Sequence, residues 1–281
     1  MKASQKKRNP WLYLVLVVMV LALLGFTTVP IIGSFIGEKA SANTGDISSD
    51  NQQELELQAK GYQLVLEREP DNQTALRGLI DIRLQQQDIE GTIEPLEKLT
   101  ELNPNLAEYG ILLAQTKQQL KDYEGAAAAY NSILDNNPGN ILALQGMVEL
   151  FLERDLPEKA ISFLKDTLKN AKEANLARPD TVDITGVELL LARIYTERQR
   201  YDEAIAIYDE AIRADENDFR PVLSKALVLQ QQGLDEEAKP LFIQAVSLAP
   251  EYKDQIVKMA GQPLEESQKP QPEEKETATE D

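Results

Sequence analysis

The chain has 281 residues with 29 basic and 47 acidic side chains, which gives a net charge of −18. Because such an acidic protein repels phosphate backbones, we expect it not to bind nucleic acid. The sequence contains neither cysteine nor histidine, which excludes disulfides, thiolate nucleophiles, histidine proton transfer and the commonest zinc ligands.

The N-terminal region has the pattern of a membrane anchor. Residues 1–10 are basic, and no charged residue occurs from Trp11 to Gly37. A helix of that length would exceed the roughly 30 Å hydrocarbon core of a bilayer. We therefore predict a cytoplasmic flank at 1–10 and a transmembrane helix, or uncleaved signal anchor, at 11–36. The positive-inside rule then puts the rest of this single-pass protein on the non-cytoplasmic side of a plasma or thylakoid membrane.

A cleaved signal peptide is the alternative interpretation of the same region. Ala40-Ser41-Ala42 has the form of a cleavage site, and cleavage after Ala42 would release a secreted domain. The uncharged run is longer than the usual h-region of about 7–15 residues, which favours the anchor. Residues 37–52 are polar without periodicity, so we predict a flexible linker there.

A period of 34 residues follows the linker. Pro70, Pro104 and Pro138 are each 34 residues apart. Before the end of each period, a small residue is followed four positions later by a large residue. A small or apolar residue comes three positions after that. This spacing puts all three residues on one face of a helix. The predicted core residues on this face are Ala126, Tyr130 and Ile133; Ala160, Leu164 and Thr167; Ala204, Tyr208 and Ala211; and Ala238, Phe242 and Ala245.

Another predicted helix precedes this one in each repeat. In three repeats it carries an alanine, Ala114, Ala192 or Ala226, where the two helices are expected to pack closest. This 34-residue pattern resembles the tetratricopeptide repeat (TPR) family, and LLARIYTERQRYDEAIAIYDEAI is the best match. The resemblance implies an all-α helix–turn–helix solenoid, coiled as a right-handed superhelix, over residues 53–260. Its predicted parts are a half repeat at 53–70, repeats at about 73–106, 107–140, 141–174, 185–218 and 219–252, and a cap helix at 251–260.

Three features depart from the family pattern. Ile80 and Val148 replace a small residue, and Thr92 replaces an alanine. About ten extra residues precede the fourth repeat, and we expect them to form only a longer helix and a loop. The tail at 261–281 is rich in proline and glutamate, so we predict that it is acidic and disordered.

The sequence contains no catalytic arrangement or phosphate-binding motif, so we predict no enzyme activity, cofactor or metal. The resemblance implies instead a protein-binding groove lined by the first helix of each repeat. A chaperone-tail clamp is not expected, because its Lys, Asn and Arg set is missing. The predicted groove residues are Arg77, Asp81, Leu84, Ile111, Gln115, Gln118, Gln145, Glu149, Leu152, Leu189, Arg193, Thr196, Leu223, Leu227 and Gln230.

These patterns favour a membrane-anchored scaffold that binds extended segments or helices of membrane-complex subunits. Such a scaffold would aid assembly or stability of the complex, as TPR assembly factors of photosynthetic membranes do. The alternatives are a TPR adaptor for cell-envelope or cytochrome c biogenesis, a secreted TPR domain, an accessory or small-ligand-binding part of an enzyme system, and a structural spacer.

Overall fold

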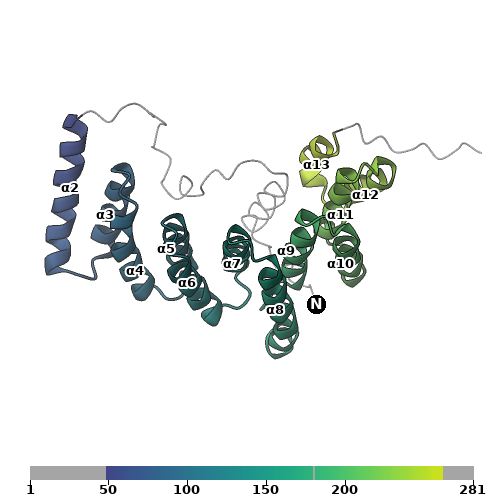
Figure 1. The fold of residues 1–281 in the computed structure, drawn as a ribbon, viewed down its shortest axis with the longest axis horizontal. Coiled ribbons are helices and arrows are strands. Elements are labelled where there is room, and N and C mark those ends of the chain that lie inside the picture. The colour runs from purple at the N-terminus through teal and green to yellow at the C-terminus, as the bar shows by residue number, and fades with distance from the viewer. Residues whose placement is uncertain (1–48, 180, 262–281) are drawn as a thin grey trace, which may run out of the picture. The chain divides into compact units, whose positions relative to one another are not determined.

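The computed structural model describes residues 49–179 and 181–261 of the chain, and these residues form helices and no strand (Figure 1). A long helix, α2 (Ser49–Arg68), comes first. Each predicted repeat then holds one pair of antiparallel helices. The pairs are α3 (Gln73–Gln85) with η2 (Glu90–Thr92) and α4 (Ile93–Leu102), α5 (Ala107–Gln119) with α6 (Tyr123–Asn136), α7 (Ile141–Glu153) with α8 (Pro157–Ala177), α9 (Ile184–Glu197) with α10 (Tyr201–Ala214), and α11 (Phe219–Gln231) with α12 (Asp235–Leu248).

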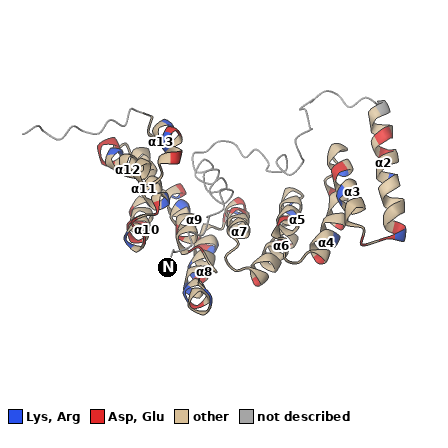
Figure 2. Cartoon of the chain, turned by 180° about the vertical axis from the view of Figure 1, so that it is seen from behind, with Lys and Arg blue, Asp and Glu red and all other residues tan. Residues whose placement is uncertain are grey.

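The chain ends its described part with a short turn, η3 (Pro250–Tyr252), and the helix α13 (Lys253–Ala260). Two compact units can be distinguished, one up to Ile194 and one from Tyr195 onward. In the first unit, α3, α5 and α7 follow one another on one side, with α4, α6 and α8 on the other (Figure 1). Charged residues of both signs are spread over the helices (Figure 2).

The predicted transmembrane helix at 11–36 and its flank at 1–10 lie outside the described residues. So does the predicted tail, apart from Gly261. Within residues 49–179 and 181–261, no helix combines the length and apolarity needed to cross a bilayer. The predicted linker at 37–52 is wrong in its last four residues, because α2 already begins at Ser49. Among these four residues, Gln52 is a good helix former, and it extends the helix that the buried Leu55 anchors.

Backbone geometry repeats with the same period as the sequence. Between the two helices of each pair, one residue adopts the left-handed conformation, with φ from 53° to 76°: Gln87, Lys121, Asp155, Gln199 and Gly233. Their spacing is 34 residues, except for 44 between Asp155 and Gln199, where the ten-residue insertion lies. Only Gly233 avoids the Cβ strain of this conformation. The recurring left-handed turn marks five equivalent repeats independently of side-chain type.

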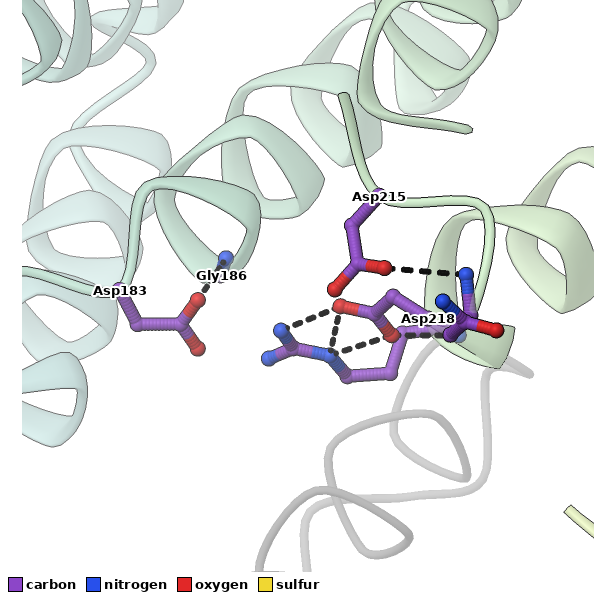
Figure 3. Close-up of polar contacts among 6 residues, drawn as sticks. Asp183, Gly186, Asp215 and Asp218 are labelled. Atoms are coloured by element: carbon purple, nitrogen blue, oxygen red, sulfur yellow. Dashed lines mark hydrogen bonds and ion pairs between the residues drawn. The ribbon is translucent and has the colours of Figure 1, made fainter. Parts of the chain in front are cut away.

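Short polar residues begin four of the first helices. Asn72, Asn140, Asp183 and Asp218 precede α3, α7, α9 and α11, and each accepts a backbone N–H bond of 3.0 Å from two or three residues further on. Figure 3 shows Asp183 and Asp218 in this role. These bonds satisfy amide groups that have no partner within the helix. Asp218 also forms an ion pair of 2.6 Å with Arg220.

The predicted helix face forms the core. All twelve predicted residues except Thr167 are buried, and Ala114, Ala192 and Ala226 are completely inaccessible. Thr167 is half-buried, and its hydroxyl donates to the Phe163 carbonyl at 2.9 Å. Burial raises the pKa of Tyr208 to about 12, because the phenolate would lose its hydration. The burial pattern confirms the frame that the sequence predicted for the helix pairs.

Two glycines of first helices lie in close contact with a tyrosine ring of the preceding helix. A Cβ on Gly78 would lie 2.4 Å from Cζ of Tyr62, and a Cβ on Gly146 would lie 2.3 Å from Cζ of Tyr130. Tyr62 lies on α2 and Tyr130 on the second helix of a repeat. Each glycine lies on the first helix of the repeat that follows. The larger residues Ile80 and Val148 lie two positions after these glycines and are buried. Ile80 packs with Leu96, Leu99 and Leu113, on other neighbours than the tyrosine that Gly78 contacts.

The insertion before the fourth repeat forms a longer helix and a loop, as expected. The helix α8 has 21 residues, whereas the helices of the other pairs have 10 to 14. The side chain of Asn175 accepts from the Val182 amide and donates to the Val182 carbonyl, both at 2.9 Å. The loop also passes Gly139 closely, because a Cβ there would lie 2.2 Å from the Thr181 carbonyl oxygen. These contacts fix the loop against the preceding repeat.

Candidate protein-binding surface

The fifteen predicted groove residues lie on the first helices α3, α5, α7, α9 and α11, but they are not equally accessible. Leu189 and Leu223 are buried, with 9% and 2% of their surface exposed, so they belong to the core. Leu189 lies in a run of three buried leucines. Leu223 is on α11, which α13 packs against in addition to α12. The prediction of a binding role for these two residues is therefore wrong in this structure.

Two further predicted residues make internal hydrogen bonds. Thr196 is hydrogen-bonded to the hydroxyl of the buried Tyr208. Gln230 donates from Nε2 to the carbonyl oxygen of Ala260 at 2.9 Å. That carbonyl ends α13, where no helical partner is available. Both side chains thus stabilise the second unit, and binding a partner would have to replace these bonds.

Three predicted residues meet between α7 and α9. Gln145 donates from Nε2 to Oε1 of Glu149 at 2.8 Å, and a guanidinium nitrogen of Arg193 lies 3.9 Å from the same oxygen. The Arg193 side chain is 14% exposed and the Glu149 side chain is 45% exposed. The carboxylate therefore faces solvent while the guanidinium beside it is largely covered. This arrangement connects the first helices of two successive pairs.

A similar contact joins α5 to α7. Gln118 donates from Nε2 to Oε2 of Glu153 at 2.7 Å, and the Tyr123 hydroxyl donates to Oε1 of Glu153 at 3.3 Å. Desolvation and the Glu153 charge raise the pKa of Tyr123. Glu153 is not among the predicted groove residues, although it follows the predicted residue Leu152 and lies 35 residues after Gln118. The signal in the sequence is a pair of polar residues about one repeat apart.

The other predicted positions remain partly or fully accessible. Arg77 and Asp81 are exposed on α3, where Arg77 donates from Nε to the Gln73 carbonyl at 3.2 Å. Partial desolvation raises the pKa of Asp81. The half-buried positions are Leu84, Ile111, Gln115, Leu152 and Leu227.

We name one set of side chains the polar ladder: Gln118, Glu153, Gln145, Glu149 and Arg193. It lies within the first unit and runs from α5 through α7 to α9. Glutamine amides offer both donors and acceptors, and carboxylates accept from cationic groups. Such a row suits the backbone and basic side chains of a peptide. Among the described residues, no group of acidic side chains is arranged to hold a metal ion.

Models of the tetratricopeptide repeat family match residues 118–178, 189–220 and 222–252. Solved structures of three other proteins that resemble this chain are each 19% identical to it or less. A crystal structure of MamA protein has 19% identity and a TM-score of 0.40, with 65% of this chain and 94% of that chain covered. Yeast Tom70 has 16% identity and a TM-score of 0.47 over 78% of this chain and 44% of that one. YrrB, described as a TPR protein with an unusual peptide-binding site, has 13% identity and a TM-score of 0.37 over 72% and 96%.

The chain therefore contains tetratricopeptide repeats, and its described residues are an all-helical TPR solenoid. Such repeats are typically non-catalytic scaffolds that bind proteins. The class of the protein is a TPR-type interaction scaffold.

Proposed function

We propose that the protein is a membrane-anchored scaffold that holds extended segments or helices of membrane-complex subunits and aids their assembly, with photosynthetic complexes as the leading candidates. The polar ladder is the observation that carries the binding part of this proposal. It offers amides and carboxylates in a row along three successive first helices. A tethered partner would meet this row at a high effective concentration, so individually weak contacts suffice.

The chemistry of the ladder favours a basic partner segment. Glu149 shares its charge with Arg193, but Glu153 receives only neutral donors in its described contacts with Gln118 and Tyr123. The exposed carboxylate can therefore accept a cationic side chain from a partner. The net charge of −18 adds long-range attraction for such a segment. We expect the bound segments to carry lysine or arginine.

Support for the membrane anchor comes from the sequence. The uncharged run from Trp11 to Gly37 is long enough to span a bilayer, and basic residues precede it. The orientation that follows puts the helical repeats on the non-cytoplasmic side. Subunits of a membrane complex would be the nearest proteins there.

Crosslinking in native membranes followed by purification of the full chain tests the binding proposal. The Glu153→Lys variant should reduce recovery of the partner by about tenfold, because the surface then repels a basic segment. Glu210→Lys is the matched control, since Glu210 is an exposed glutamate on the second helix α10. Circular dichroism should show both variants folded. Equal recovery by the two variants would rule out the polar ladder as the binding surface.

Two measurements test the anchor. The intact mass of the purified protein distinguishes a chain that keeps its first residues from one cleaved after Ala42. Protease added to membrane vesicles of known sidedness should cleave the repeats only from the non-cytoplasmic face. Release of a soluble chain beginning at Asn43 would favour the secreted alternative, and cleavage from the cytoplasmic face would reverse the orientation.

A further inference from the structure

The helix α2 has one buried face and one exposed apolar face. Leu55 and Ala59 are buried against α3 and form a cluster with Leu79 and Ile82. On another side of the same helix, Leu57 and Leu64 expose 71% and 51% of their surface, and the adjacent Val65 exposes 39%. Isolated exposed leucines are common, but a group on one stripe of a single helix indicates a contact surface.

The exposed residues follow the spacing of a helix-packing seam. Positions 54, 57, 61, 64 and 68 alternate in steps of three and four, which keeps them on one face and is the spacing of coiled-coil contacts. Val65 lies beside Leu64 on this face. We name these residues the outer stripe: Glu54, Leu57, Gly61, Leu64, Val65 and Arg68.

Gly61 lies at the centre of the outer stripe, and no contact with another described residue explains it. A Cβ at Gly61 would meet no atom within 4 Å, whereas a Cβ at Gly78 would lie 2.4 Å from the Tyr62 ring. Glycine within a helix is unfavourable relative to alanine, because it loses more conformational freedom. Gly61 therefore gives room on the outside of the helix, where a second backbone can approach closely.

The charges at the two ends of the outer stripe indicate which helix, and in which direction, can pack against it. Figure 2 shows acidic positions in the upper part of α2 and an acidic and a basic position together at its lower end. Glu54 lies seven residues before Gly61 and Arg68 lies seven residues after it. A copy of α2 that runs in the opposite direction therefore meets each charge with its opposite. A parallel copy would put like charges together.

We propose that the outer stripe is a self-association surface, on which α2 of a second copy packs antiparallel about a two-fold axis at Gly61. Leu57 then faces Val65 of the second copy, and Glu54 faces Arg68 of the second copy. Each pair occurs twice because the interface is the same patch on both chains. The apolar residues lie between the charged ends, so water is excluded from the centre of the contact.

Disulfide formation in the full chain tests this arrangement, because the natural chain has no cysteine to compete. Gly61→Cys should give a disulfide-linked dimer in detergent-solubilised protein. Leu57→Cys alone should not, because two copies of residue 57 lie about 12 Å apart along the helices, beyond the Cα distance of about 7 Å that a disulfide spans. A mixture of Leu57→Cys and Val65→Cys chains should form heterodimers. Ala128→Cys, an exposed position on α6, controls for random collision.

A charge exchange tests the same axis without cysteine. Arg68→Glu should weaken dimerisation by about tenfold, measured as the dimer fraction in sedimentation, because it makes two like-charge pairs. The double variant Glu54→Arg with Arg68→Glu should restore dimerisation. Strong crosslinking of Leu57→Cys to itself would overturn the antiparallel axis. A disulfide yield for every cysteine variant no higher than that of the Ala128→Cys control, or disulfides formed only with another protein, would overturn self-association.

Discussion

The first and last described helices end the repeats in opposite ways. At the C-terminal end, α13 buries Ile256 and Ala260, while Lys253, Asp254 and Lys258 are exposed. At the N-terminal end, α2 exposes two leucines and a valine. Stacked repeats need a polar outer face at their ends to stay soluble, and only α13 provides one. Within residues 49–179 and 181–261, α13 covers the C-terminal end of the repeats with a polar outer face, whereas α2 leaves an apolar outer face exposed at the N-terminal end.

Specific contacts hold the C-terminal end in place. Phe219 stacks on Tyr252 with ring centroids 5.5 Å apart, and Gln230 donates to the last carbonyl of α13. Gln230, which the sequence predicted as a groove residue, thus holds the cap helix α13 in place. The outer stripe of α2 has no described contact of this kind.

Ile256→Asp should have the largest effect of the variants that compare the two ends. Ile256 is 1% exposed, and a carboxyl group there would cost about 4 kcal/mol of unfolding free energy. Leu57→Asp, which makes the same kind of change on the exposed stripe, should cost less than about 0.5 kcal/mol in monomeric protein. Urea unfolding of the full chain measures both values, and hydrogen exchange should localise the first effect to α11–α13. Similar losses for the two variants would contradict the comparison.

Gly78→Ala should destabilise the protein by about 2 kcal/mol, because the added methyl group would overlap the Tyr62 ring. The affected contact joins α2 to α3, so the loss of stability should be localised at the N-terminal end of the repeats. Adding Tyr62→Leu should recover part of the loss. A thermal-unfolding series of the two single variants and the double variant measures this coupling, and strictly additive effects would show that the two residues do not share a contact.

Exchanging glycine and glutamine at the left-handed turn residues near the two ends should change the stability of the protein in opposite directions. Gln87→Gly should stabilise the first pair by about 1 kcal/mol, since glycine removes the strain of a positive φ. Gly233→Gln should destabilise the last pair by a similar amount. Chemical denaturation with and without each exchange provides the comparison. A loss of stability in Gln87→Gly would mean that the side chain contributes more than its backbone strain costs.

Gly61→Ala should stabilise dilute, monomeric protein by about 0.5–1 kcal/mol. The methyl group meets no atom of the described part of the chain, so the higher helix propensity of alanine determines the expected effect. Thermal unfolding at several protein concentrations checks this value. A loss of stability even at the lowest concentration would indicate an internal contact at Gly61.

The sequence predicted the helix pairs well because their core contacts are local and periodic. Ala126 and Tyr130 lie one turn apart on a single helix, so their spacing alone shows which face is buried. The glycine–tyrosine pairs were not predicted, because Tyr130 and Gly146 belong to helices of different repeats. Recognising them requires knowledge of how neighbouring units pack.

The candidate surface was predicted less completely for the same reason. Gln145, Glu149 and Arg193 were expected on first helices, and the structure brings them together. Leu223 is buried in the capped second unit, which its own position in the repeat does not reveal. Glu153 was missed because its contact with Gln118 spans two repeats.

The glycine–tyrosine pairs set the size of the block that can be duplicated or deleted in this chain. Tyr62 and Tyr130 are 68 residues apart, as are Gly78 and Gly146. Deleting residues 73–106 would bring Leu112 opposite Tyr62, and the ring would then meet a leucine where it needs a glycine. Deleting residues 73–140 would bring Gly146 opposite Tyr62 and restore the match. Two repeats, and not one, are the smallest module that could be exchanged here without redesigning a neighbour.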